Sequence, residues 1–94
     1  MKRAKSYYVV INGVQRGITD SWEECKEYVN GYPGNHYKGF LRLEEAIDYL
    51  KQHLPENKGP YGFQLKGEHQ EFKTLEELIE FVKKIAERIQ GVMP

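Results

Sequence analysis

Apolar residues near the start of the chain fall into short runs that predict β-strands. The first run, residues 7–11, is aromatic and β-branched throughout (Tyr-Tyr-Val-Val-Ile), a composition typical of strands. Asn12-Gly13 favours the positive φ angles of a hairpin turn, so residues 17–20 are expected to return as a second strand. A third strand is predicted near residues 36–40.

Side chains alternate between the two faces of a strand, which assigns the residues of the first run to two sets. Tyr7, Val9 and Ile11 share one face, and we interpret it as the core face. Tyr8 and Val10 share the other face. Tyr8 is therefore expected to point outward, where it could contact a ligand.

Two helices are predicted next to these strands, because apolar residues recur there at helical spacing. Ser21 and Glu24 form a capping box that begins the first, over residues 22–30. Its apolar stripe consists of Trp22, Cys25 and Val29. Pro55 ends the second helix, whose stripe consists of Leu43, Ala46, Ile47, Leu50 and Leu54. Trp22 has two open interpretations, as a core residue or as a ligand contact.

The rest of the chain repeats the same kinds of element after a connector over residues 55–60, rich in Pro and Gly. Two short strands are predicted, at residues 61–65 and 71–72. A second capping box, Thr74 with Glu77, begins the longest helix. Its wide apolar stripe includes Leu75, Leu78, Ile79, Val82, Ile85 and Ala86.

These elements predict an α+β fold with a small antiparallel sheet packed against two to three helices. Residues 1–54 form a ββαβα module with three strands, and residues 55–94 a strand–helix extension of the same compact domain. Its strands, over 61–72, would extend the sheet at its edge. We expect a monomer, the alternative being a dimer formed through the C-terminal helix, whose stripe could also bind another protein.

The composition of the chain limits the classes of protein and of partner that can be expected. The chain has 94 residues, 39% of them apolar and 30% charged, as in a globular domain. The formal net charge is zero, so any nucleic-acid binding must come from a local patch. The single cysteine, the missing signal-peptide pattern and the lack of a long apolar run predict a cytoplasmic protein with no membrane partner.

The residues offer no catalytic constellation. The carboxylates fall mainly in first turns and on polar faces of helices, whereas two-metal hydrolysis needs several that converge. His36, His53 and His69 show no metal-ligand spacing. We therefore predict a protein that is not an enzyme and that uses no cofactor or metal.

One stretch carries a specific motif. Residues 21–25 read SWEEC, residues 31–34 read GYPG and residues 37–40 read YKGF, in that order after the YYVV strand. Over residues 7–50 this combination resembles the N-terminal hybrid-binding domain of eukaryotic-type ribonucleases H, which is also found in caulimovirus viroplasmin. Residues 55–94 lie outside the resemblance.

The resemblance implies non-catalytic binding of RNA/DNA hybrid, and more weakly of double-stranded RNA, through backbone, 2′-hydroxyl and phosphate contacts in the minor groove. Aromatic side chains would contact the DNA backbone, lysines its phosphates, and backbone amides of the turn the RNA 2′-hydroxyls. The positions that this implies are Tyr8, Trp22, Lys26, Gly31, Pro33, Gly34, Tyr37 and Lys38.

The charge around these positions is sparse. Gly39 stands where relatives often carry a second lysine, so we expect weak binding, about micromolar. His36, beside the turn, is a candidate for a pH-dependent phosphate contact. The alternative is a protein-interaction module that keeps the fold without binding nucleic acid.

Overall fold

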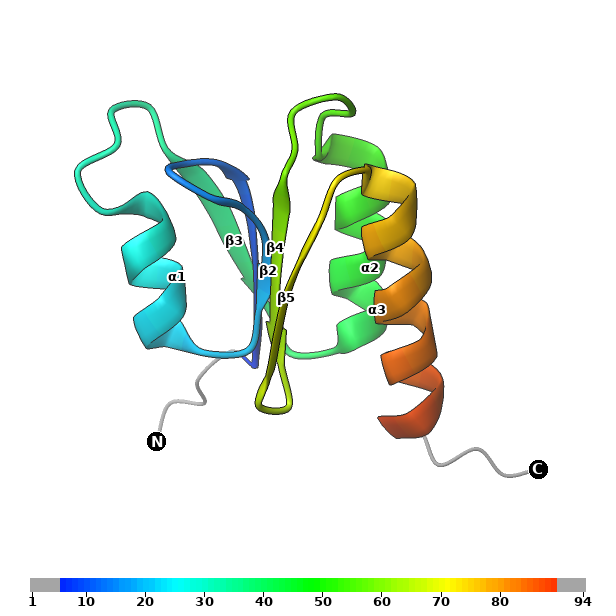
Figure 1. Cartoon of the computed structure of the whole chain (residues 1–94). Helices are drawn as coiled ribbons and strands as arrows, with labels where there is room; N and C mark the ends of the chain where they lie inside the picture. The colour runs from blue at the N-terminus through cyan, green and yellow to red at the C-terminus, as the bar shows by residue number, and fades with distance from the viewer. Residues whose placement is uncertain (1–5, 90–94) are drawn as a thin grey trace, which may run out of the picture.

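The computed structural model describes residues 6–89 as one five-stranded sheet with three helices. Along the chain the elements are β1 (Tyr7–Asn12), β2 (Arg16–Thr19), α1 (Trp22–Val29), β3 (His36–Phe40), α2 (Leu43–His53), β4 (Tyr61–Leu65), β5 (Glu68–Phe72) and α3 (Leu75–Ile89). The strands lie in the order β3-β1-β2-β4-β5. Figure 1 shows α1 on one face of the sheet and α2 and α3 on the other. The predicted α+β class is confirmed.

Strand β1 is buried on both faces. Val9 lies in the larger core, under α2 and α3. Val10 and Tyr8 lie on the opposite face, in a smaller cluster with Cys25, Tyr28 and Val29 of α1. The exposed fraction of Tyr8 is only 9%, so the expectation that Tyr8 points outward is wrong. The reason is that α1 covers the second face, which the alternation pattern alone does not reveal.

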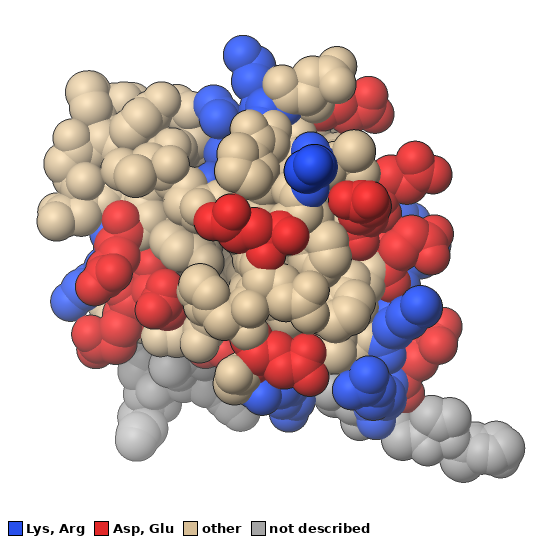
Figure 2. Space-filling view, in the orientation of Figure 1, with Lys and Arg blue, Asp and Glu red and all other residues tan. Residues whose placement is uncertain are grey.

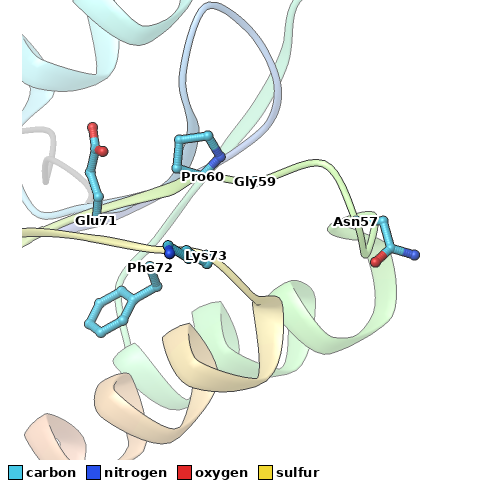
Figure 3. A pocket seen from close by; sticks show the side chains of 6 residues that line it. All are labelled: Asn57, Gly59, Pro60, Glu71, Phe72 and Lys73. Atoms are coloured by element: carbon cyan, nitrogen blue, oxygen red, sulfur yellow. The ribbon is translucent and has the colours of Figure 1, made fainter.

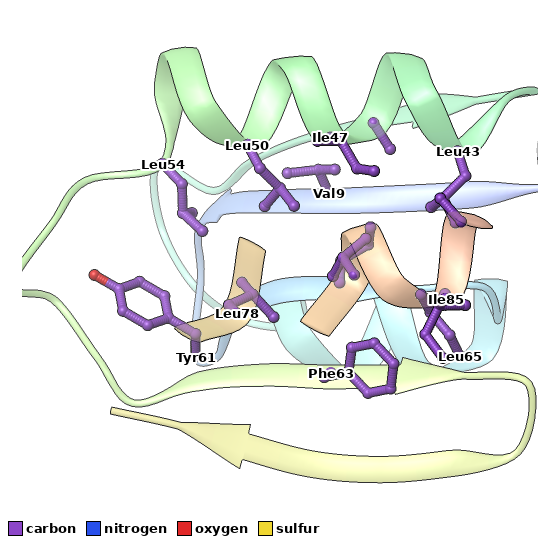
Figure 4. Close-up of a cluster of buried hydrophobic side chains, with 14 of the residues drawn as sticks. Val9, Leu43, Ile47, Leu50, Leu54, Tyr61, Phe63, Leu65, Leu78 and Ile85 are labelled. Carbon is purple, nitrogen blue, oxygen red and sulfur yellow. The ribbon is translucent and has the colours of Figure 1, made fainter. Parts of the chain in front are cut away.

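The larger core fills the space between the sheet and the α2–α3 layer (Figure 4). From the sheet it takes the fully buried Ile18, Phe63 and Leu65, and from α2 and α3 it takes Leu50 and Leu78. The stripe of the last helix is thus buried largely within its own chain. At about 25 cal/mol per Å² of apolar surface, this burial is the main stabilising term of the fold.

Strand β4 joins the sheet through the free edge of β2, and the two strands run parallel. The extension over residues 61–72 therefore continues the sheet, as predicted, but the sheet is mixed and not purely antiparallel. Both edges of β1 are already occupied by β2 and β3, so a later strand can pair only with the outer edge of β2 or of β3, and β4 pairs with β2.

The β2–β4 pairing depends on two glycines that face each other. Gly17 lies opposite Gly62 in the register and has a φ of +150°. A Cβ atom on Gly17 would overlap the backbone of Gly62, including its carbonyl oxygen. Backbone atoms cannot move aside as a flexible side chain can, so a larger residue would force the two strands apart.

The helix starts agree with the predicted caps. The Glu24 N–H donates to Ser21 Oγ at 3.3 Å, and the Glu77 N–H donates to Thr74 Oγ1 at 3.2 Å. Arg42 precedes α2 without a side-chain cap and instead forms a 2.9 Å ion pair with Glu44. None of the helices within residues 6–89 combines the length and the apolar character that crossing a bilayer requires.

We predict that Gly17→Ala destabilises the protein by about 2–4 kcal/mol, because it breaks the pairing that attaches β4 and β5. Gly67→Ala is the matched control. Gly67 also has a positive φ, +81°, but a Cβ atom there would have no neighbour within 4 Å. We expect it to cost about 1 kcal/mol, from backbone strain alone. Urea unfolding of both variants measures the difference, and equal losses would show that the Gly17–Gly62 approach is unimportant.

Candidate nucleic-acid interface

Three aromatic side chains form a row across β1, α1 and β3. The rings of Tyr8 and Trp22 are 5.4 Å apart between centroids, and those of Trp22 and Tyr37 are 5.9 Å apart. Both pairs are tilted, at 48° and 47°, within the range of favourable aromatic contacts. We call Tyr8, Trp22 and Tyr37 the aromatic row.

The row is buried at one end and open at the other. Tyr8 lies in the small cluster under α1, whereas Trp22 and Tyr37 have exposed fractions of 43% and 38%. Trp22 occupies the first turn of α1, one turn before the buried Cys25, so it stands at the border of the helix stripe. Trp22 therefore packs against its neighbours and also presents an apolar surface to solvent.

A shallow hollow lies beside the row. Trp22 and Tyr37 line it together with Lys26 of α1 and Gly31 of the following loop. The structure thus brings together four of the positions implied by the resemblance, and Tyr8 lies behind them. Glu23 and Glu27 line the same hollow.

The turn over residues 31–34 owes its shape to two glycines. Gly31 and Gly34 have φ angles of +70° and +75°, which other residues adopt only with strain. A Cβ atom on either would meet nothing within 4 Å. The protein itself therefore leaves open space around both. Pro33, between them, is exposed at the tip of the same turn.

Two side chains hold this turn against the β1–β2 hairpin. Arg16 donates from Nε to the Ile11 carbonyl and from Nη2 to Asn12 Oδ1, both at 3.0 Å. Asn12 in turn donates from Nδ2 to the Gly34 carbonyl at 2.9 Å. Sequence reasoning missed this link, since Asn12 reads there only as a turn residue. It orients the Gly34 peptide from a strand that is more than 20 residues away.

Lys38 does not join the aromatic row. It pairs with Val9 in the β1–β3 register, whereas Tyr37 pairs with Val10, so the two side chains project to opposite faces. The Lys38 Nζ atom lies 5.7 Å from the ring centroids of both Phe40 and Tyr49, on the α2 side of the sheet. The position is still at the sheet edge, because β3 is an outer strand.

Few basic side chains lie near the aromatic row, and acidic side chains lie among them. Figure 2 shows acidic and basic side chains interspersed over the visible face, with an uncharged region over the loop between α1 and β3 at the upper left. Lys26 stands between Glu23 and Glu27, which lowers the positive potential that it can contribute.

Cys25 lies behind the aromatic row, in the small cluster with Tyr8. Cys25 is fully buried, and burial raises the pKa of its thiol to about 11, so the thiolate form is scarce at neutral pH. Within residues 6–89, no group of three or more His, Cys, Asp or Glu side chains is placed to hold a metal ion.

A second hollow lies near the end of β5 (Figure 3). Its lining residues are Asn57, Gly59, Pro60, Glu71, Phe72 and Lys73. Apart from Glu71 and Lys73, these side chains are uncharged.

We predict that Asn12→Ala frees the turn without unfolding the protein. Backbone ¹⁵N relaxation should show increased motion at residues 31–34, because the Gly34 carbonyl loses its donor. The free energy of unfolding should fall by about 1–2 kcal/mol, the net value of the two hydrogen bonds that Asn12 makes, one to the Gly34 carbonyl and one from Arg16 Nη2. Gln70→Ala, at an exposed position of β5, is the control and should leave the turn unchanged. Unaltered relaxation in Asn12→Ala would contradict the positioning role.

Comparison with known proteins places the aromatic row and the turn in a matched segment. Residues 6–50 match the family model described as Ribonuclease H1 N-terminal domain. The chain is 50% identical over 48 residues to a Ribonuclease H of Crithidia fasciculata, a match that covers 51% of this chain and 10% of the relative. It is 40% identical over 62 residues to a Ribonuclease H of Saccharomyces cerevisiae, covering 66% of this chain and 17% of the relative.

A Transactivator/viroplasmin protein of Cauliflower mosaic virus is 49% identical over 41 residues, covering 44% of this chain and 8% of the viral protein. The matches therefore span less than a fifth of each of these three relatives. No solved structure matches the chain significantly. Over residues 6–50, the chain is therefore similar to the ribonuclease H1 N-terminal domain family.

Proposed function

We propose that this chain binds RNA/DNA hybrid, and double-stranded RNA more weakly, without cleaving either. The observation that carries the proposal is the half-exposed pair Trp22 and Tyr37 beside the positive-φ turn, within the segment that matches the family. The duplex would lie across this surface with its minor groove toward the protein.

The aromatic row suits the DNA strand of a hybrid. Deoxyribose lacks the 2′-oxygen, so it presents a more apolar surface to the open faces of Trp22 and Tyr37. Because Tyr8 supports Trp22 from behind, at 5.4 Å, little side-chain freedom remains to be lost on binding. A preorganised aromatic surface contributes more affinity than a mobile one.

The turn suits the RNA strand. RNA-containing duplexes expose 2′-hydroxyls along a wide, shallow minor groove. The open space around Gly31 and Gly34 would let a ribose approach the backbone closely. Within residues 6–89, the Gly34 N–H has no protein acceptor, so it can donate to a 2′-hydroxyl oxygen. Pro33 has no N–H to donate, so it would act here only through the conformation that it gives the turn.

The charges support weak, salt-dependent binding. Lys26 at the hollow and Lys38 at the sheet edge are the two lysines of the implied set that would contact phosphates. Each phosphate contact contributes about 0.9 to the slope of log K against log salt. Two contacts therefore predict a shallow slope, of about two.

A second candidate function is a protein-interaction module. The observation that favours it is that Glu23 and Glu27 share the hollow with Lys26, in a chain with no net charge. An apolar protein contact on Trp22 and Tyr37 would be nearly insensitive to salt, whereas duplex binding weakens as salt rises.

We propose that the chain is a binding module and not a nuclease. The matched segment is an N-terminal domain that makes up a small part of each ribonuclease H relative. The carboxylates near the row, Glu23 and Glu27, lie on one helix face beside Lys26, an arrangement that serves solubility and helix stability.

We predict that Trp22→Ala weakens binding to RNA/DNA hybrid by about 1–2 kcal/mol, or roughly 5- to 30-fold, because stacking contributes energies of this size. Fluorescence anisotropy with labelled hybrid, double-stranded RNA and double-stranded DNA of one sequence, in low salt, measures it. The wild-type protein should prefer the hybrid.

Val14→Ala is the matched control, since Val14 is an exposed apolar side chain, 67% accessible, on the β1–β2 hairpin. It should bind the hybrid like the wild-type protein, and circular dichroism should show both variants folded. If the wild-type protein binds no duplex at tens of micromolar, the proposed function is wrong. Equal affinities of Trp22→Ala and wild type would remove Trp22 from the interface.

A further inference from the structure

Strand β3 lies at one edge of the sheet and projects polar and aromatic side chains toward both faces. Tyr37 projects toward the α1 side, and His36 and Lys38 project toward the α2 side. Among residues 6–89, no strand pairs with the outer edge of β3. A long ligand that approaches this edge can therefore contact side chains from both faces at once.

On the α2 side, three basic side chains gather around one tyrosine. The Tyr49 hydroxyl and His36 Nε2 are 3.1 Å apart, a hydrogen bond across β3 and α2. The His53 ring lies 4.4 Å from the Tyr49 ring between centroids, and Lys38 Nζ lies 5.7 Å from the same centroid. We call His36, Lys38 and His53 the basic cluster.

The cluster lacks a carboxylate that neutralises it. In the part of the chain that the structure describes, no ion pair involves its three members. The acidic side chain on the same stripe of α2 is Glu45, one turn before Tyr49, and the β1 residue opposite His36 is the uncharged Asn12. All three members are exposed, so an anion can reach them.

The charge of the cluster depends on pH. A histidine side chain in general gains its positive charge as the pH falls from about 8 to about 5. Protonation of His36 and His53 would place up to three positive charges around one tyrosine. Such a concentration of positive charge, with N–H donors on every member, suits a phosphodiester.

We propose that the basic cluster is a second phosphate-binding site, which holds the backbone of a nucleic-acid duplex from the α2 side of β3 and binds it more tightly when His36 and His53 are protonated. This inference rests on the proposed function, since the duplex on the aromatic row brings phosphates to the β3 edge. It explains why Lys38 points away from the row. Lys38 would contact the duplex from the second face, and the two histidines would act with it.

The test compares hybrid binding at pH 7.5 and pH 5.5, at one ionic strength, for wild type and the double variant His36→Gln/His53→Gln. We expect wild-type binding to tighten about 3- to 10-fold at pH 5.5. The slope of log K against log salt should steepen by about one to two, one step for each new phosphate contact. The double variant should show the same affinity for the hybrid at both pH values.

His69→Gln is the matched control, because His69 is an exposed histidine on β5, at the opposite edge of the sheet. It should keep the full pH response, and circular dichroism at both pH values should show all variants folded. A pH response that persists in the double variant, or none in wild type that binds the hybrid, overturns the inference alone. Absence of hybrid binding at both pH values overturns the proposed function together with the inference.

Discussion

The burial of β1 on both faces is the constraint from which the rest of the molecule follows. Val9 requires an apolar layer on one side and Val10 requires another on the opposite side, so the helices must divide between the two faces. Helix α1 is alone on its face, held by Cys25, Tyr28 and Val29. That short contact fixes where the first turn of α1 lies, and with it the position of Trp22.

The same constraint links the extension to the candidate site. Residues 61–89 complete the larger core that covers the Val9 face, and the Gly17–Gly62 approach attaches them to β2. Loss of that layer would expose one face of β1. The aromatic row on the other face would then lose the rigid sheet beneath it. The extension therefore supports the proposed binding surface without touching it.

Local patterns predicted the elements well because caps, turns and apolar periods are properties of neighbouring residues. Ser21, Pro55 and Thr74 mark the starts and stops that the structure shows. The prediction that Tyr8 points outward was wrong. The alternation of side chains along a strand shows which residues share a face, but it does not show whether both faces are covered. The unbroken apolar run of β1 was the available signal, since such runs are typical of strands buried on both sides.

Other features depend on partners distant in sequence, which a local pattern does not contain. The parallel pairing of β4 with β2 is one, and the Asn12–Gly34 hydrogen bond is another. The separation of Lys38 from Tyr37 could have been predicted, because adjacent residues of a strand project to opposite faces. The gathering of His53 and Tyr49 beside β3 could not, since it requires the docking of α2.

The central claim is that an RNA/DNA hybrid binds across the open end of the aromatic row and the turn over residues 31–34. A ¹H–¹⁵N NMR titration of the labelled protein with a short hybrid tests it most directly. We predict the largest shift changes at the Trp22 indole N–H and at the amides of Gly31, Gly34 and Tyr37, with β5 and α3 nearly unchanged. Changes confined to β5 and α3, or none at Trp22 and the turn, would contradict the account.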